Sequence, residues 1–327
     1  MSEFLPLGEW VDRGVKFVID NDGGTLERLG SGIGSFTESI ELGLQAPPVG
    51  VVVSVLVLTA WWRVGWQFAL FCLACCFVIY DTGFWPQTMV TLALVFAATF
   101  ISLLLGLPLG IGVAASRRMA AVVRPTLDFM QTMPAFVYLI PAAMLFGLGR
   151  VPGVLATVIF AMPPVVRLTS LGIRQVNKEQ VEAGITFGCT PLQVLFKVQI
   201  PGAMPSIMAG INQTIMMALS MVIIASMVGA GGLGNDVLAS IQRLDIGLGF
   251  ESGLAVVLLA GALPALTLPW PLSGWRRVFM VAGFPLSVAL SGSVAGELPA
   301  WAWLLPLALL VLLYPLKAWR DAPFFPT

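Results

Sequence analysis

The chain offers few residues whose types and spacing could support catalysis or metal binding. It contains no histidine, so neither a Ser/His/Asp nor a Cys/His arrangement can be assembled. Cys72, Cys75 and Cys76 lie together in an apolar segment, but no second cysteine pair follows them. Structural zinc sites are built from paired cysteines and histidines. We therefore expect no metal site and interpret the three cysteines as small apolar residues of a helix.

Gly229–Gly234 matches the G-x-G-x-x-G pattern of dinucleotide-binding loops. That function requires a preceding strand within a βαβ unit, whereas the segment before Gly229 is rich in Met, Ile and Ala. We interpret the glycines as a flexible turn. The sequence also lacks G-x-x-x-x-G-K-[ST], so we expect no nucleotide or other cofactor to be bound by this chain.

The most informative residues form a polar island, Arg174–Gly184, between two strongly apolar segments. Charged residues are only 10% of the chain, so a long polar loop of this kind indicates a soluble partner. The pattern predicts a short helix from about Asn177 to Phe187, closed by Gly188, because glycine readily adopts the left-handed conformation that ends helices.

A second short helix is predicted directly after the first. Thr190 is expected as its N-cap and Pro191 as its first residue, while Pro201 is expected to end it. One apolar stripe follows from the i, i+3, i+4 spacing of Leu192, Leu195 and Phe196. A helix–glycine–helix elbow of this kind can fit a groove of a soluble partner while remaining attached to two membrane spans.

The composition indicates an integral membrane protein of the all-α class. Hydrophobic residues make up 58% of the chain and the mean hydropathy is +0.93, whereas soluble domains carry roughly 25% charged residues. A spanning helix needs about 20 mostly apolar residues. The expected spans are Pro48–Trp62, Val64–Tyr80, Trp85–Ala115, Thr126–Leu148, Val154–Leu171, Pro205–Val228, Phe250–Leu268, Val278–Val294 and Ala300–Leu316.

Lys and Arg predict the orientation of these spans, because basic residues accumulate on the cytoplasmic side. With the polar island in the cytoplasm, twelve of the 17 basic residues lie inside. The remaining five are Arg13, Lys16, Arg28, Arg150 and Arg243. We therefore expect a multi-pass protein of the inner (plasma) membrane with its N-terminus outside and its C-terminus in the cytoplasm.

Residues 1–47 are expected to form an extracytoplasmic segment. Apolar residues between Leu7 and Val18 recur at helical spacing, which predicts an amphipathic helix on the membrane surface. Its role is either to bind a partner or only to rest on the membrane. Asn21–Ser35 is expected to be a loop.

The polar island resembles the cytoplasmic coupling loop of permease subunits of binding-protein-dependent ABC importers. The matching residues are Glu182, Ala183, Gly184, Gly188, Val198, Ile200 and Pro201. In that family the loop docks on a separate ATPase subunit, which implies an exposed charge for Glu182 and a hinge for Gly188. The third position is usually Ala in the family and is Gly184 here, which keeps a small residue at some loss of helix propensity.

Four further stretches resemble the glycine betaine/proline betaine branch of these permeases. They are Asp128–Tyr138, Pro163–Arg167, Met204–Gln213 and Ala218–Val228. The resemblance covers about Trp85 to Leu259 and is expected to fail beyond Gly261.

The resemblance implies a polytopic helical bundle with a type I importer-like permease core at 85–268 and a coupling loop at 174–204. Two peripheral spans (48–84) precede the core, and an apolar C-terminal extension (269–327), interpreted as two further spans, follows it. The implied assembly in the lipid bilayer is a homodimer with two ABC ATPase subunits, which hold ATP and Mg, and an extracytoplasmic substrate-binding protein. No nucleic acid is expected as a partner.

The implied cargo is a quaternary ammonium osmolyte such as glycine betaine, proline betaine or choline. An importer of methionine or another amino acid would use the same loop and stays open as an alternative. A secondary transporter that needs no ATPase is a rival from another class. It predicts charged relays within the membrane, whereas Arg167 and Glu251, the charges nearest the spans, are both expected near span ends.

Several polar residues inside the expected spans are candidates for the translocation pathway, because polar groups in a membrane are costly unless they face protein or water. Interhelical hydrogen bonding is the alternative role for each of them. The candidates are Gln131, Thr132, Tyr138, Asn212, Gln213, Ser220 and Ser226.

Overall fold

The computed structural model describes residues 13–14, 16–17, 20–21, 24–63 and 65–267, and all regular structure in this part of the chain is helical. The chain divides into two compact units, residues 1–271 and 272–327. The spans expected at Val278–Val294 and Ala300–Leu316 lie outside the described residues, as does most of the helix expected between Leu7 and Val18. The expected all-α class is confirmed for the described residues.

The N-terminal region is more helical than its sequence predicted. Helix α2 (Thr25–Gln45) begins after Gly24, whose φ is 86°, so the loop expected over Asn21–Ser35 is wrong over most of its length. Side-chain hydroxyls of this helix bond backward to its own carbonyls. Ser31 donates to the Arg28 carbonyl at 3.0 Å, and Thr37 donates to the carbonyl four residues back at 2.8 Å.

Two short apolar helices, α3 (Val49–Arg63) and α4 (Trp66–Asp81), follow α2. The bend between α2 and α3 is 96°. These helices occupy the spans expected at 48–62 and 64–80, but they have 15 and 16 residues, fewer than the roughly 20 needed to cross a bilayer alone.

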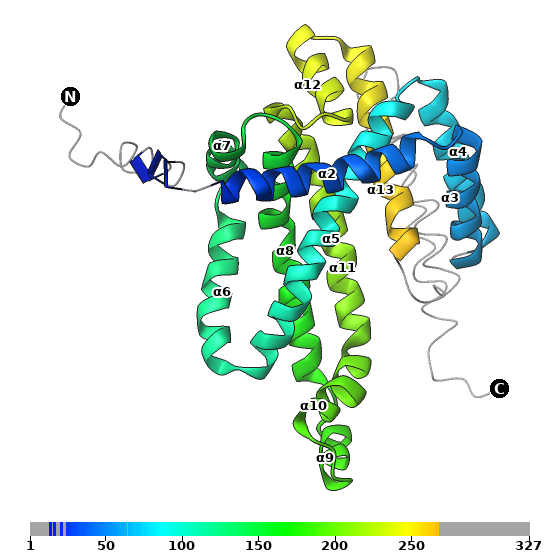
Figure 1. Cartoon of the computed structure of the whole chain (residues 1–327). Coiled ribbons are helices and arrows are strands. Elements are labelled where there is room, and N and C mark those ends of the chain that lie inside the picture. Colours follow the sequence, from blue (N-terminus) through cyan, green and yellow to red (C-terminus); the bar gives the residue numbers. More distant parts are fainter. Residues whose placement is uncertain (1–12, 15, 18–19, 22–23, 64, 268–327) are drawn as a thin grey trace, which may run out of the picture. The chain divides into compact units, whose positions relative to one another are not determined.

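Three long helices form the trunk of the molecule: α5 (Trp85–Ala115), α8 (Arg150–Gln175) and α11 (Ile200–Ala225). They lie side by side in Figure 1, with α2 crossing α5 and α8. Where α2 crosses the trunk, Glu41 of α2 forms an ion pair with Arg150, the first residue of α8, with a nitrogen–oxygen distance of 2.9 Å.

Glycines allow the trunk helices to approach closely. A β-carbon at Gly106 of α5 would lie 2.5 Å from Cγ1 of Val165 in α8, and one at Gly110 would lie 2.7 Å from Cβ of Thr169. A β-carbon at Gly210 of α11 would lie 3.2 Å from Cα of Val165. Gly106 and Gly110 are four residues apart, the small-xxx-small spacing at which membrane helices pack backbone to backbone. Helix α8 is therefore held between α5 and α11.

The single span expected at Thr126–Leu148 is wrong. Two helices occupy this region, α6 (Arg117–Thr132) and α7 (Ala135–Phe146), and they meet at 95°. Pro134 causes the break, because a residue before proline is pushed out of the helical region. Met133 accordingly has ψ 137°.

Beyond the trunk, α11 continues into a short 3-10 helix, η2 (Ser226–Val228), followed by α12 (Leu233–Arg243) and α13 (Ile246–Thr267). Gly229, Gly231 and Gly232 all have positive φ, so the glycine run forms a turn between helices, as expected. Among the described residues, four helices are long and apolar enough to cross a membrane, and up to six spans result if each of the two bent pairs counts as one.

Candidate functional site

The polar island lies at the end of the trunk opposite α12 and forms an elbow, residues 177–200 (Figure 1). Its first helix, α9 (Lys178–Thr186), is capped by Asn177, whose side chain accepts a hydrogen bond from the Glu179 backbone N–H at 2.9 Å. No residue of α9 is buried. The predicted helix is confirmed and its surface is open.

Gly188 ends this helix, as the sequence predicted. Its φ is +84°, and its N–H donates to the Ile185 carbonyl at 2.9 Å. The next N–H, of Cys189, donates to the Gly184 carbonyl at 3.1 Å. This pair of bonds is the Schellman motif, which satisfies carbonyls that the helix end would leave without partners.

The second helix, α10 (Pro191–Val194), begins with the predicted N-cap. The Thr190 hydroxyl accepts from the Gln193 backbone N–H at 3.4 Å, and the Gln193 side-chain oxygen accepts from the Thr190 N–H at 2.9 Å. This reciprocal arrangement is a capping box. Its sequence signal, Thr followed three residues later by Gln, was present but was not used in the prediction.

Pro201 does not end the second helix, contrary to expectation. Helix α10 passes through a π-helical turn, η1 (Leu195–Gln199), directly into α11. The Ile200 N–H donates five residues back, to Leu195. This wider turn accommodates the proline, which has no N–H to donate and would clash with a carbonyl in a regular helix. The elbow is thus joined to the trunk by continuous helix.

The predicted apolar stripe of the second helix divides between two environments. Leu195 packs with Ile173 and Ala203 of the trunk. The other two stripe residues, with two from the first helix, remain exposed. These four define the elbow patch, which consists of Ile185 (59% exposed), Phe187 (88%), Leu192 (67%) and Phe196 (61%).

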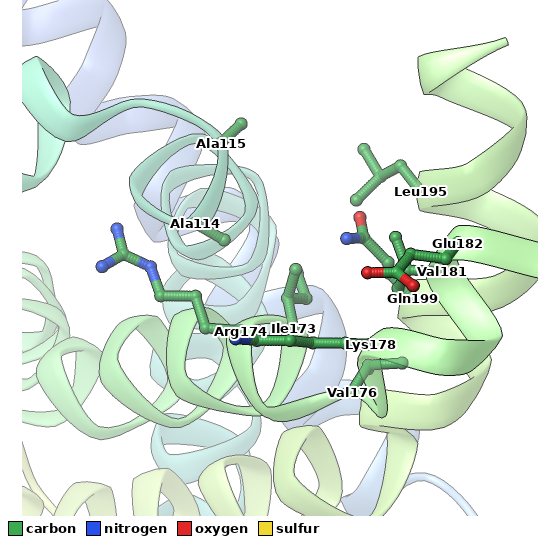
Figure 2. Close-up of a pocket in the computed structure, with 10 residues that line it drawn as sticks. All are labelled: Ala114, Ala115, Ile173, Arg174, Val176, Lys178, Val181, Glu182, Leu195 and Gln199. Atoms are coloured by element: carbon green, nitrogen blue, oxygen red, sulfur yellow. The ribbon is translucent and has the colours of Figure 1, made fainter. Parts of the chain in front are cut away.

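Glu182 is exposed, and it also lines a cavity of about 410 Å³ between the elbow and the ends of α5 and α8. Figure 2 shows Glu182 and Gln199 on the elbow side of this cavity, with Ala114 and Ala115 of α5 across from them. Lys178, one helical turn before Glu182, also lines it. A carboxylate is therefore placed where the elbow meets the trunk.

Arg174 of α8 forms a hydrogen bond to α5 beside this cavity. Its Nη2 donates to the Val113 carbonyl at 2.5 Å, in the last turn of α5. A cation is favourable there, because the carbonyl end of a helix carries partial negative charge. The end of α8 that leads into the elbow is therefore linked to the end of α5.

Of the remaining predicted loop residues, Gly184 and Val198 lie against each other. Ala183 is exposed, while Gly184, Val198 and Ile200 are partly buried. A β-carbon at Gly184 would lie 3.5 Å from Cγ2 of Val198, so the two arms of the elbow contact each other at these two residues.

The seven pathway candidates lie in different environments. Thr132, Gln213 and Ser220 are exposed, and Gln131, Tyr138 and Asn212 are partly buried. Ser226 is buried and donates to the Ile223 carbonyl at 2.5 Å. It packs against Gly234, where an added β-carbon would lie 2.0 Å from its hydroxyl oxygen.

Arg167, which was expected near a span end, forms a contact that the sequence did not predict. This residue lies within α8, which continues to Gln175, and it forms an ion pair with Asp128 of α6. The sequence reasoning placed both residues on the cytoplasmic side but did not identify them as a pair, because nothing in either segment indicates which helix lies beside it.

The family match and the relatives found by sequence indicate the same kind of protein. The family described as "binding-protein-dependent transport system inner membrane component" matches residues 106–313. The resemblance therefore extends past Gly261, where it was expected to fail. The glycine betaine/proline betaine transport system permease protein of Escherichia coli is 48% identical over 80% of this chain and 74% of its own length.

A second relative, the glycine betaine transport system permease protein of Bacillus subtilis, is 44% identical over 80% of this chain and 93% of its own length. Among solved structures, an inward-facing MetNI methionine ABC transporter chain has a TM-score of 0.49 at 19% identity. The match covers 61% of this chain and 93% of the transporter chain.

Proposed function

Because the chain belongs to the binding-protein-dependent transport system inner membrane component family, we propose that it is the membrane subunit of an ATP-driven importer whose ATP is hydrolysed by a separate subunit. Two copies of the chain would associate with two ATPase subunits, which hold ATP and Mg, and with an extracytoplasmic substrate-binding protein. The chain itself supplies the membrane path and the coupling loop, residues 174–204.

The observation that carries this proposal is the exposed elbow. The elbow patch is apolar yet exposed on a capped and locally well-ordered loop, and exposed apolar residues rimmed by polar ones mark interaction sites. An ATPase subunit with a groove fits this shape, because the elbow projects from the trunk (Figure 1).

The contacts of the elbow supply a route for force. Continuous helix joins α10 to α11. At the other arm, α9 follows α8, and the Arg174–Val113 hydrogen bond joins the end of α8 to α5. Displacement of the elbow by the ATPase would therefore move three trunk helices together. That is the mechanical requirement for alternating access driven by a partner.

We also propose that the elbow faces the cytoplasm, with the N-terminus outside and the C-terminus inside. The distribution of basic residues supports this orientation. Single cysteines placed at residues 30 and 235 should react with an impermeant thiol reagent added to intact cells, whereas one at residue 178 should not. Reaction at 178 from outside would reverse the proposed orientation.

For cargo we propose glycine betaine, proline betaine or a related quaternary ammonium solute. The relatives named for glycine betaine support this choice over methionine. The pathway would be lined by polar residues of α6, α7, α11 and η2, of which the exposed Thr132, Gln213 and Ser220 are best placed. The full set of candidates is Gln131, Thr132, Tyr138, Asn212, Gln213, Ser220 and Ser226.

The test is Glu182→Lys in the complex reconstituted with its ATPase and binding protein. We expect normal insertion but loss of ATP-driven betaine uptake, with either weaker ATPase association or hydrolysis that no longer responds to the loaded binding protein. The physical reason is that a third cation would join Lys178 and Arg174 around the cavity.

Glu179→Lys is the matched control, because it makes the same charge change on an exposed residue of α9 that does not line the cavity. Wild-type uptake and stimulation in Glu182→Lys would remove this residue from the coupling route. Uptake by the wild-type chain without any ATPase would instead support a secondary transporter.

A further inference from the structure

Asp128 of α6 and Arg167 of α8 form an ion pair whose side chains remain largely open. The side chains are 65% and 44% exposed, respectively. Elsewhere α6 packs against the trunk with apolar residues, among them Leu127, which is 2% exposed, beside the buried Val165 and Val166. The ion pair therefore lies at the open edge of the α6–α8 contact, which Figure 1 shows as two neighbouring helices.

Arg167 lies in the middle part of α8, and Asp128 lies about one helical turn before the end of α6 at Thr132. Arg167 is about 12 Å along α8 from its end at Gln175, and Asp128 is about 16 Å along α6 from its start at Arg117, at 1.5 Å per residue. The hydrocarbon core of a bilayer is about 30 Å thick. In the proposed importer, in which α8 crosses the bilayer, we therefore place the pair within the membrane and not at the water interface.

One largely exposed stripe of α6 is polar over about two turns, whereas other faces of the helix expose apolar residues such as Phe129, which is 63% exposed. Arg124, Asp128, Gln131 and Thr132 fall at i, i+4, i+7 and i+8, so they share one face of the helix. Val122, which is 70% exposed, lies about 120° around the helix from Asp128 and about 80° from Thr132, at 100° per residue. Charged residues that face lipid are strongly disfavoured, so water, a polar solute or a polar face of the second copy must cover the stripe.

We propose that Asp128 and Arg167 bind a zwitterionic quaternary ammonium solute during its passage through the membrane. This inference rests on the proposed function and deepens it. The planar guanidinium of Arg167 suits a carboxylate, to which it can donate two parallel hydrogen bonds. Asp128 suits the quaternary ammonium, which carries no N–H and is recognised by charge. The solute has both groups, and the ion pair presents the two complementary charges side by side.

The ion pair also provides a resting state for this site. Without solute the two charges satisfy each other, so neither is left unpaired at membrane depth, which would be costly. When the solute enters, it exchanges one contact between opposite charges for two. The net gain in binding free energy is therefore smaller than that of two new contacts. Such weak binding suits a transport path, because the solute must leave again.

The first test uses Asp128→Asn, Arg167→Gln and the double variant in the full reconstituted complex. Each single variant leaves one unpaired charge, so both should lower thermal stability, whereas the double variant should recover it. Glycine betaine uptake should nevertheless fall in all three, by roughly ten- to a hundredfold, as expected for loss of a charge-assisted hydrogen bond. Hydrolysis stimulated by the loaded binding protein should persist.

Recovery of both stability and uptake in the double variant would show that the pair only ties α6 to α8, and would overturn the proposal. Absence of ATP-driven uptake by the wild-type chain is a different failure, because it would remove the proposed function and this inference with it. Loss of stimulated hydrolysis in the double variant would also count against a binding role, since it would place the defect in coupling.

The second test leaves the ion pair intact. Thr132→Cys, on the polar stripe, is compared with Val122→Cys, both with Cys189→Ala because Cys189 is the only native cysteine that is not buried. A water-soluble methanethiosulfonate should modify Thr132→Cys much faster, and saturating glycine betaine should slow that reaction. Equal rates at the two positions, or no protection by glycine betaine, would contradict a solute site on this face.

Discussion

In the trunk, Gly110 of α5 faces Thr169 of α8 so closely that an added β-carbon would lie 2.7 Å from that residue's Cβ. At the elbow, Gly188 has no atom within 4 Å of the corresponding position, yet its φ is +84°. Gly110 is required because a neighbouring side chain leaves no room for a β-carbon, and Gly188 is required because its own backbone has a positive φ. The trunk is therefore specified by packing between helices, whereas the bend of the elbow is specified by local conformation.

This difference suits a part that receives force and a part that transmits it. The elbow has no buried residue in α9 and can adapt to a partner surface. The trunk helices are interlocked at several glycines and can move only as a group. Substitutions in the two regions should consequently fail in different ways.

Gly110→Ala should give the largest loss of stability. Thr169 is fully buried and β-branched, so its side chain cannot turn away, and α5 must separate from α8. We expect a cost of about 1–3 kcal/mol, typical of overpacking, seen as a lower melting temperature in detergent together with loss of uptake. Gly43→Ala is the control, since nothing lies within 4 Å of its added carbon. Equal melting temperatures for the two variants would show that the trunk is not packed through Gly110.

Gly188→Val should separate function from stability. A β-branched residue is strongly disfavoured at positive φ, at roughly 1–3 kcal/mol, so the Schellman motif should open and α10 should lose its direction. The melting temperature of the trunk should change little, while uptake and stimulated hydrolysis should fall. Gly188→Asn should retain more activity, because Asn tolerates the left-handed region. A Val variant as active as the Asn variant would mean that the bend is not needed.

The elbow could be predicted from sequence because its structure is local. The Gly188 hinge and the Thr190 cap each depend on residues within a few positions of themselves. The prediction that Pro201 ends the second helix was wrong, because a π-helical turn accommodates a residue that has no N–H to donate. Local rules name the problem that a proline poses but do not say which of several solutions the chain adopts.

The trunk was predictable as a set of apolar helices but not as an arrangement. The contact of Gly106 and Gly110 with α8 joins residues about sixty positions apart, and nothing in one apolar segment identifies its neighbour. The same limit hid the Asp128–Arg167 pair. Hydropathy placed one span over 126–148, whereas the break before Pro134 leaves Asp128 within α6, opposite α8.

Gly184→Ala should have the smallest effect, and its sign should be opposite. Gly184 lies inside α9 with no positive φ, and its added β-carbon would meet Cγ2 of Val198 at 3.5 Å and Cγ2 of Val194 at 3.7 Å, which are ordinary contacts. Neither the steric argument of Gly110 nor the backbone argument of Gly188 applies to it. Alanine is better than glycine in a helix by about 1 kcal/mol, and its methyl group would pack between the two arms of the elbow.

The expected result for Gly184→Ala is therefore a more stable elbow with unchanged transport. Amide exchange in α9 should slow by roughly fivefold, the factor that 1 kcal/mol gives, while betaine uptake stays at the wild-type level. Gly188→Ala is the matched control, because it adds the same methyl group four residues on, at a position of positive φ, and it should speed exchange. Slower amide exchange together with lost uptake in Gly184→Ala would show that the elbow must remain flexible for coupling. Equal exchange rates in Gly184→Ala and Gly188→Ala would show that the stability of the elbow does not depend on which of the two glycines is replaced.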